Sequence, residues 1–288
     1  MRDHDATVSI GGSIFIQPEE VSDTIARIRQ FESYIHNSRR FFIVGPNFGP
    51  YTDEFFISEF RRLFADVDDV CFRDVTSFDL FKNLPNVRMA SDVVFSLQNY
   101  TLSASVDPSA KKNVVVSVID LSRRPDLSEY TDAYERFLVD ISKKYQDLGY
   151  EITLVGFCEY EGDGIAIDSL LRKYPEMKFR KCVYTGDTQE VLGLLKSSEL
   201  VVSTRFHSLV LAILFERPFV SISYSNKTRN LLSDIGLSNA DHPIASLVTK
   251  SDSMYDFMTA SIEEKEVAQL SSNAEGQFKA LDAYILND

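Results

Sequence analysis

The chain has 288 residues, and its 43 acidic and 30 basic side chains give a formal net charge of −13 at pH 7. Hydrophobic residues make up 44% of the chain and charged residues 25%, which is the composition of a globular protein and excludes a disordered or collagen-like chain. The acidic balance argues against nonspecific nucleic-acid binding, which depends on Lys and Arg neutralising phosphates. The length suits two domains of ordinary size.

No segment of the sequence predicts membrane insertion or secretion. The longest apolar runs, such as residues 209–215, are far shorter than the ~20 residues that span a bilayer, and MRDHDATVSI contains no signal-peptide core. Cys71, Cys158 and Cys182 are widely spaced and show no metal-ligand pattern. These features predict a reducing cytoplasmic location, no transmembrane segment and no metal site.

In chain order, an apolar run, a glycine or polar turn and a helical pattern follow one another repeatedly. The predicted buried strands lie at residues 7–10, 41–44, 70–72, 93–96, 114–119, 152–157, 181–184, 200–203 and 219–223. The predicted helices lie at residues 20–37, 53–63, 130–148, 165–173, 188–196, 206–215, 227–232 and 262–286. Fully apolar strands that alternate with helices are typical of parallel sheets covered on both faces, so the predicted fold class is α/β.

Residues 98–113 interrupt this order with small polar residues, a proline and two lysines. We predict an N-terminal domain at residues 1–105, a C-terminal domain at residues 106–260 and a final helix at residues 261–288. The two domains are predicted to meet near the linker, with the substrate cleft between them. The final helix has no strand after it, and it either packs back on the N-terminal domain or lies on its own domain.

Ligands of parallel sheets bind at the carboxyl ends of the strands, so the residues after each strand carry the functional prediction. Gly11 and Gly12 follow the first predicted strand, and GPNFGPY at residues 45–51 follows the second. Glycine lets a ligand approach the backbone closely. Neither loop has the spacing of a GxGxxG or P-loop nucleotide site.

Four cationic side chains follow predicted strands in this otherwise acidic chain, namely Arg73, Arg205, His207 and Lys227. Helix N-termini attract anions, and added Arg, His and Lys side chains suit a phosphate or carboxylate. The pattern therefore predicts a pocket for a small, multiply charged anion. Simpler alternatives stay open, because an Arg-Asp pair also suits a surface ion pair and a histidine at a helix start also suits a cap or a buried polar group.

Other polar residues carry weaker signals. His4 and His242 lie in predicted loops, and His36 ends a predicted helix. Cys158 follows a strand without a nearby His–Asp set, which favours a packing role. Asp163 and Asp168 suit loop ligands, but Glu-Gly-Asp-Gly at residues 161–164 is equally a plain turn.

Residues 201–237, VVSTRFHSLVLAILFERPFVSISYSNKTRNLLSDIGL, resemble the C-terminal motif of polysaccharide pyruvyl transferases. In that family a strand ends in S-x-R-[LF]-H, and the next strand carries P-x-[VI]-x-I-x-Y-x-x-K. Four N-terminal segments are also similar to the family in the same order. They are D-x-x-V-x-x-GG-x-x-F at residues 5–15, a Gly-Pro turn at residues 45–50, R-D-x-x-S at residues 73–77 and Ala-Ser-Asp at residues 90–92.

The resemblance implies two Rossmann-like domains with mainly parallel sheets in a glycosyltransferase-B-like arrangement. It also implies transfer of pyruvate from phosphoenolpyruvate to two hydroxyls of a sugar, in a polysaccharide or its precursor, which gives a ketal and free phosphate. Phosphoenolpyruvate is then a donor substrate, and no cofactor is expected. Family members begin with an additional strand and a G-N-x-G-D loop, which the N-terminal domain is expected to lack because four residues precede Asp5.

The resemblance assigns Arg73, His207 and Lys227 to the phosphoenolpyruvate site, where we predict that they converge. The predicted catalytic residue is His207, and the predicted substrate-binding residues are Arg73, Arg205, Lys227, Gly11, Gly12 and Ser77. The expected acceptor is a sugar or oligosaccharide, free or lipid-linked. Two alternatives stay open, a glycosyltransferase-B enzyme that uses a nucleotide sugar and a non-catalytic relative that binds an anionic glycan.

Overall fold

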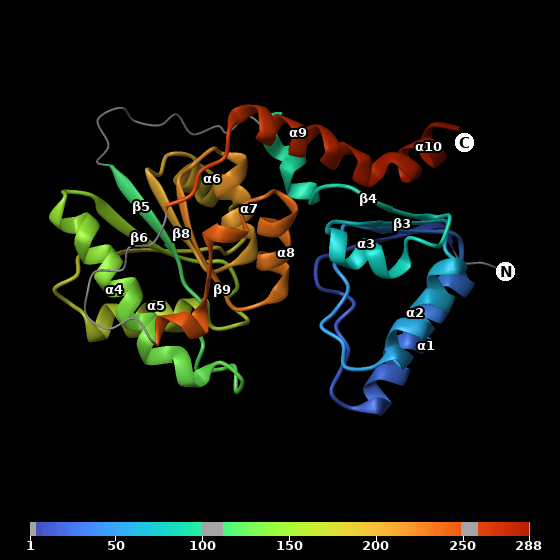
Figure 1. The fold of residues 1–288 in the computed structure, drawn as a ribbon, viewed down its shortest axis with the longest axis horizontal. Helices are drawn as coiled ribbons and strands as arrows, with labels where there is room; N and C mark the ends of the chain where they lie inside the picture. Colours follow the sequence, from blue (N-terminus) through green and yellow to red (C-terminus); the bar gives the residue numbers. More distant parts are fainter. Residues whose placement is uncertain (1–3, 100–111, 249–258, 288) are drawn as a thin grey trace. The chain divides into compact units, whose positions relative to one another are not determined.

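The structure is a computed structural model that describes residues 4–99, 112–248 and 259–287 (Figure 1). The chain forms two compact units, one of residues 1–97 with 268–288 and one of residues 98–267. Their strands belong to two separate sheets. The predicted domain boundary at residues 105/106 lies outside the described residues, and the predicted domain assignment stays a prediction.

The first unit contains a four-stranded sheet of order β1-β2-β3-β4 in which all neighbours are parallel. Its strands are β1 His4–Ile10, β2 Ser38–Val44, β3 Asp69–Phe72 and β4 Val87–Met89. The connecting helices are α1 Val21–Asn37, α2 Glu54–Ala65 and α3 Val75–Phe81. These three helices lie on one face of the sheet, and α10 (Lys279–Asn287) lies on the other (Figure 1).

Phenylalanine rings fill the core between the sheet and the helices of the first unit. On α2, Phe56, Phe60 and Phe64 recur at the four-residue spacing that puts side chains on one face of a helix, and all three are buried. Phe81 lies edge-on to the Phe48 ring, with a centroid distance of 4.8 Å. Edge-to-face packing of this kind stabilises aromatic cores by ~0.5–1.5 kcal/mol per pair beyond the burial of area.

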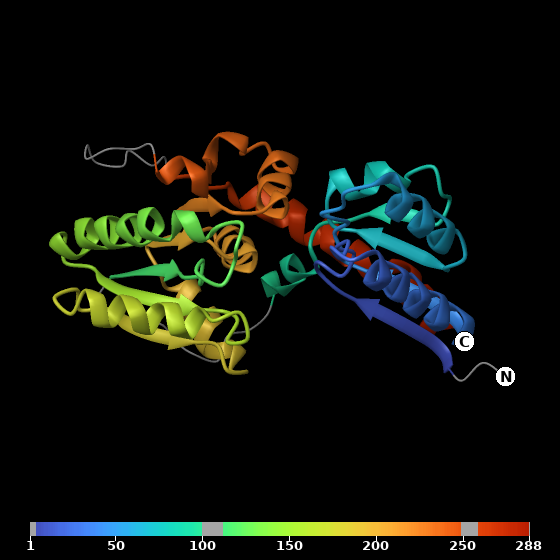
Figure 2. The ribbon, with the colours of Figure 1, turned by 90° about the horizontal axis from the view of Figure 1, so that it is seen from below.

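The second unit contains a six-stranded parallel sheet of order β10-β9-β8-β5-β6-β7. Its strands are β5 Asn113–Ser117, β6 Glu151–Gly156, β7 Arg180–Val183, β8 Leu200–Ser203, β9 Phe219–Ser223 and β10 Asp241–Pro243. Its α-helices are α4 Thr131–Asp147, α5 Asp163–Lys173, α6 Thr188–Lys196, α7 Phe206–Leu214 and α8 Asn226–Asp234. Helices α4 and α5 run side by side on one face, and α6, α7 and α8 cover the other (Figures 1 and 2).

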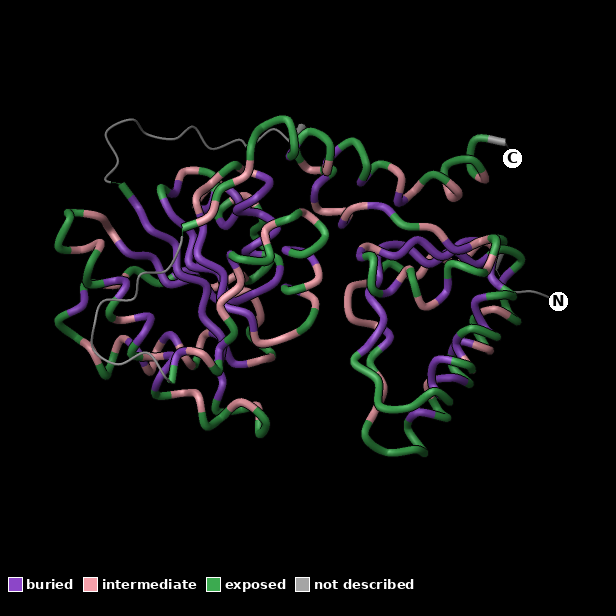
Figure 3. Tube along the Cα trace, in the orientation of Figure 1, coloured by how far each residue is buried: buried purple, intermediate pink, exposed green. Residues whose placement is uncertain are grey.

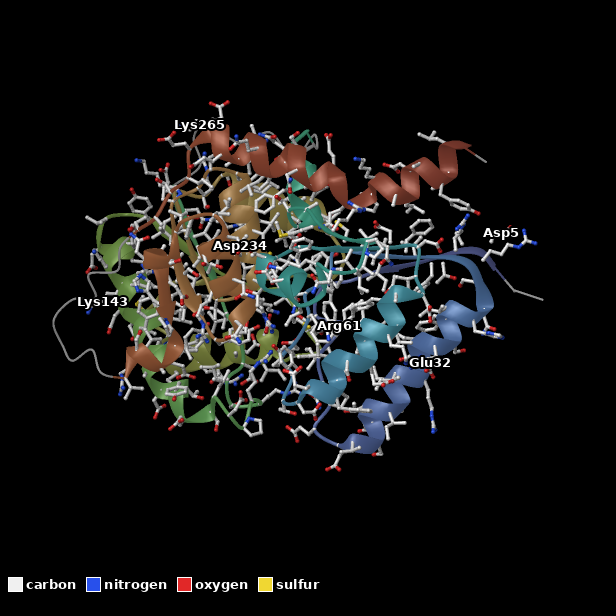
Figure 4. All side chains as sticks on the ribbon, turned by 45° about the vertical axis from the view of Figure 1, so that its right-hand side comes forward. Asp5, Glu32, Arg61, Lys143, Asp234 and Lys265 are labelled. Atoms are coloured by element: carbon white, nitrogen blue, oxygen red, sulfur yellow. The ribbon has the colours of Figure 1, made fainter. Side chains whose placement is uncertain are left out.

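Burial follows these layers. Figure 3 shows the buried segments gathered in the strands of each sheet and the exposed segments on the outer sides of the helices. Charged side chains occupy those outer sides, among them Arg61 of α2, Lys143 of α4 and Asp234 of α8, which are labelled in Figure 4. Within the described residues, no helix is both long and apolar enough to cross a lipid bilayer.

Two predicted elements differ in the structure, and His4 and His242, predicted to lie in loops, belong to β1 and β10. Residues 93–96, predicted as a strand, belong to a 3₁₀ helix, η1 (Val93–Asn99). The Asp92 carboxylate accepts a hydrogen bond from the Val94 amide at 2.9 Å and so starts a helical turn instead of a strand. The predicted helix 262–286 is divided into α9 (Glu264–Glu275) and α10 by a 3₁₀ turn, η5 (Gly276–Phe278).

The η5 turn joins the C-terminal residues to the carboxyl ends of β3 and β4. The buried Gln277 side chain donates from Nε2 to the carbonyl oxygens of Ala90 at 2.9 Å, Ser91 at 3.1 Å and Phe72 at 3.3 Å. Arg88 of β4 donates to the Gln277 carbonyl oxygen at 2.8 Å and pairs with Asp69. The C-terminal residues therefore complete the hydrogen bonding of this sheet edge.

Replacing Gln277 with alanine is expected to lower the free energy of unfolding by about 1–3 kcal/mol, because buried carbonyl oxygens lose their donor. Urea unfolding followed by circular dichroism measures the change. Gln30→Ala is the matched control, because Gln30 lies exposed on α1 and its amide donates to the exposed Tyr34 hydroxyl. Equal stabilities of the two variants would contradict the role given to Gln277.

Candidate functional site

Helix α7 carries the motif histidine at its first turn. The apolar sequence of this helix is buried at every position from Phe206 to Leu214 except His207, which is exposed. The helix starts directly after β8, at the carboxyl edge of the sheet. A helix that is apolar all round is a core helix, so its exposed histidine does not serve the packing of α7.

Helix α8 places Lys227 beside the same helix start. Strands β8 and β9 are parallel neighbours, so the helices that follow them begin at the same sheet edge. The Lys227 ammonium lies 5.9 Å from the centroid of the Phe206 ring, and the His207 ring lies 5.3 Å from it. The structure therefore brings His207 and Lys227 close to one phenylalanine ring, at two helix N-termini that favour an anion.

Arg205, which precedes α7, is held by a fully buried carboxylate. Its Nε donates to Asp163 Oδ2 at 3.0 Å and its Nη2 donates to Asp163 Oδ1. Asp163 Oδ2 also accepts the amides of Phe157 and Cys158, each at 2.9 Å. Burial lowers the pKa of Arg205, but the hydrogen bonds and charge of its acidic neighbours outweigh this and raise the pKa, so the guanidinium stays charged.

A second carboxylate, that of Glu161, bridges Arg205 to Arg124. Glu161 Oε2 accepts from Nη1 of Arg205 and from Nη2 of Arg124. Burial raises the pKa of Glu161, but hydrogen bonding and charge from Arg205, with the charges of Arg124 and Lys227, hold that pKa below its ordinary value. The Arg124 guanidinium lies 4.9 Å from the centre of the Tyr224 ring, which suits a cation–π contact.

The first unit holds its own cation at a sheet edge. Arg73 follows β3, and its side chain is 5% exposed. It donates from Nη1 to Asp92 at 2.8 Å and from Nη2 to Asn47 Oδ1 at 2.7 Å. The Gly12 backbone passes near this guanidinium, since a Cβ built on Gly12 would lie 3.5 Å from both Nη atoms. Gly11 leaves room for Ile14, whose Cγ2 would be 2.6 Å from an added Cβ.

Ser77 is buried beneath this edge. Its hydroxyl donates to Asp74 Oδ2 at 2.8 Å and accepts the Phe48 amide at 2.7 Å. Asp74 also accepts the Ser77 amide and so caps α3. The Arg-Asp-x-x-Ser motif thus fixes the loop of residues 45–51 to the start of α3, and a substrate contact of Ser77 stays a prediction.

The family description that matches this sequence is "Polysaccharide pyruvyl transferase", over residues 4–226. The chain belongs to this family. The resemblance based on the motifs of both halves is thereby confirmed, and the match includes Arg73, Arg205 and His207 but ends one residue before Lys227.

Three individual proteins that are similar to this chain share a small part of its sequence. The amylovoran biosynthesis protein AmsJ of Erwinia amylovora is 21% identical over 86% of this chain. The matched region covers 63% of the length of AmsJ. The UDP-GlcNAc 2-epimerase of Methanocaldococcus jannaschii, solved with UDP-GlcNAc and UDP, has a TM-score of 0.54 at 11% identity and covers 93% of this chain and 75% of its own. A functionally uncharacterized protein of Klebsiella pneumoniae is 17% identical, with a TM-score of 0.47, over 84% of this chain and 77% of its own.

The likeness to the epimerase concerns the fold alone. Together with the two parallel sheets it confirms the predicted α/β class with two Rossmann-like halves of the glycosyltransferase-B type. Nothing in this likeness bears on the substrate.

The predicted site residues of this family member fall into two groups. Gly11, Gly12, Arg73 and Ser77 gather at the sheet edge of the first unit, and Arg205, His207 and Lys227 gather at that of the second. The predicted convergence of Arg73 with His207 and Lys227 joins residues of both units and stays a prediction.

Sequence reasoning missed the residues that surround Arg205. Arg124 and Glu161 belong to no motif. For Asp163, the sequence allows either a ligand-binding role or a place in a plain turn. Among residues 4–99, 112–248 and 259–287, no group of three or more His, Cys, Asp or Glu side chains could hold a metal ion. The absence of a metal site and of a cofactor stays a prediction.

Proposed function

We propose that this chain transfers the pyruvyl group of phosphoenolpyruvate to two hydroxyls of a saccharide and releases phosphate. The observation that carries the proposal is the exposure of His207 on an otherwise buried helix, beside Lys227 and at the carboxyl edge of a parallel sheet. An imidazole titrates near neutral pH, which suits it to proton transfer. Family membership supports the pyruvyl group as the unit transferred.

The reaction needs one proton transfer to carbon. His207 would donate a proton to the methylene carbon of phosphoenolpyruvate, which makes C2 electrophilic, and the first hydroxyl oxygen then bonds to C2. The second hydroxyl oxygen bonds to C2 as the bond from C2 to the phosphate oxygen breaks. One hydroxyl proton restores the imidazolium and the other leaves with phosphate, so the atoms balance.

The donor carries a phosphate and a carboxylate, and both need cations. Lys227 and the arginines would neutralise these groups, most of all as charge develops on the leaving phosphate. Phosphoenolpyruvate acts here as a substrate, and the proposed chemistry requires no cofactor. The acceptor in this proposal is a sugar or oligosaccharide of a polysaccharide pathway, free or lipid-linked, in keeping with the name of the Erwinia relative.

The proposal is tested by phosphate release. The purified chain is incubated with phosphoenolpyruvate and a panel of saccharide acceptors, and acceptor-dependent release of phosphate with a stable ketal product is the expected result. Thermal unfolding provides a second readout, in which phosphoenolpyruvate raises the melting temperature and UDP does not. Protection by UDP alone would favour a nucleotide-sugar enzyme, and protection by phosphoenolpyruvate without turnover on any acceptor would favour a non-catalytic anion-binding relative.

A further inference from the structure

We propose that the Glu161 carboxylate occupies the position of a substrate anionic group, and that Arg124 is a further residue of the anion site. This inference rests on the proposed function, because it concerns the same sheet edge. An incoming phosphate or carboxylate would displace Glu161 and take over its two arginine partners. Glu161 is then a competitor built into the chain, and its removal strengthens anion binding.

The two carboxylates that hold Arg205 differ in their exposure to solvent. The Asp163 side chain is fully buried, while the Glu161 side chain is 40% exposed. Removing a buried, hydrogen-bonded partner leaves an uncompensated charge in the interior, whereas a partner that is partly exposed to solvent can be replaced at a lower cost. Asp163 therefore keeps Arg205 in place, and Glu161 is the partner that a ligand can replace.

Arg124 stays at the site when Glu161 leaves. Its guanidinium lies over the Tyr224 ring, and Tyr224 directly follows β9. The loop that carries Arg124 is held by backbone hydrogen bonds from the Arg124 amide to Leu121 at 3.0 Å and from the Leu127 amide to Arg124 at 2.9 Å. The ring contact and the two backbone hydrogen bonds do not involve Glu161, so Arg124 stays in position for a new anion.

The charge around Glu161 fits a doubly charged ligand. Arg124 and Arg205 bond its carboxylate, and the charge of Lys227 acts on it as well. With Glu161 displaced, an incoming anion would meet the guanidinium groups of Arg124 and Arg205, and the charge of Lys227 acts at the same position. A phosphate monoester, which carries about −1.5 to −2 at neutral pH, suits such a group of cations.

The comparison of charge-matched variants tests the proposal. Glu161→Gln removes the competing carboxylate, and Glu159→Gln removes the same charge from an exposed position of the same loop. Arg124→Gln removes the added cation, and Arg123→Gln removes an exposed neighbouring cation that donates to the Tyr160 carbonyl oxygen. Affinity for phosphoenolpyruvate and, separately, for inorganic phosphate is measured by isothermal titration calorimetry.

Glu161→Gln is expected to bind phosphate and phosphoenolpyruvate about 3- to 30-fold more tightly. In the unaltered chain the Glu161 carboxylate occupies the anion site in most molecules, and the apparent affinity falls in proportion to the fraction of molecules whose site is open. Arg124→Gln is expected to bind both about 10-fold or more weakly, as loss of a charged hydrogen bond predicts. The Glu159 and Arg123 variants are expected to bind like the unaltered chain. Melting temperatures measured in parallel show whether each variant is folded.

Unchanged or weaker binding by Glu161→Gln overturns the proposal, and so does an equal gain in Glu159→Gln or unchanged binding by Arg124→Gln. Use of both probes separates this result from the proposed function. Binding of phosphate but not phosphoenolpyruvate by the unaltered chain would contradict the proposed donor, while the phosphate affinities of the variants would still decide the role of Glu161. Binding of neither anion by the Glu161→Gln variant overturns the present proposal.

Discussion

Asp163→Asn is expected to lower the free energy of unfolding by about 3–5 kcal/mol, the usual effect of removing one member of a buried ion pair. Asp163 is fully buried and makes two bonds to Arg205 and two to backbone amides. Asparagine keeps one acceptor oxygen but presents an amide group to the guanidinium. Arg205 then loses its buried counter-charge and retains the partly exposed Glu161 as an acidic partner.

Urea unfolding followed by far-ultraviolet circular dichroism measures this loss, and hydrogen exchange of α5 and α7 peptides localises it. Asp168→Asn is the matched control, because Asp168 lies on the same helix and its ion pair with Lys181 is partly exposed. An exposed pair of this kind contributes at most about 1 kcal/mol. An Asp163 variant as stable as the Asp168 variant would show that the buried pair does not support this sheet edge.

The ion pair between Arg205 and Asp163 could not be predicted from the sequence. The strand pattern predicts Arg205 at the end of β8, and the family motif includes it, but neither identifies Asp163 as its ion-pair partner. Asp163 follows β6, and β5 lies between β6 and β8 in the sheet. Strand order is set by tertiary packing, so a Glu-Gly-Asp-Gly run reads the same whether it is a plain turn or the support of an arginine. The residue before Asp163 is Gly162, and its φ of 89° lies in the left-handed region that favours glycine.

The position of His207 was predictable, but its exposure was not. The S-x-R-F-H motif places it at the start of a helix after a strand, which the structure confirms. The apolar residues around it give α7 no polar face from which to infer which side meets solvent. Arg124 and Glu161 lie in loops without motif or periodicity, so their meeting follows from the fold alone.

The second large effect is expected in turnover. His207→Ala is expected to lower the rate of phosphate release by about 10²- to 10⁴-fold, the usual range for a general acid–base group. The fold should persist, because the other eight residues of α7 provide its buried contacts and the His207 side chain is exposed. His207→Gln keeps hydrogen bonding but cannot titrate, so it should retain affinity for phosphoenolpyruvate and lose rate.

Three measurements on the same variants separate the possible roles of His207. A proton donor loses kcat with affinity kept in the glutamine variant, whereas a phosphate ligand shows its loss mainly in the apparent affinity for phosphoenolpyruvate. A packing residue would show a lowered melting temperature and near-normal kinetics in the folded fraction. His36→Ala, an exposed histidine of α1, controls for the loss of an imidazole elsewhere and should leave turnover unchanged. Normal turnover by a folded His207→Ala protein would contradict the catalytic assignment, because the rate of phosphate release would then not depend on His207, the one side chain of α7 that is exposed to solvent.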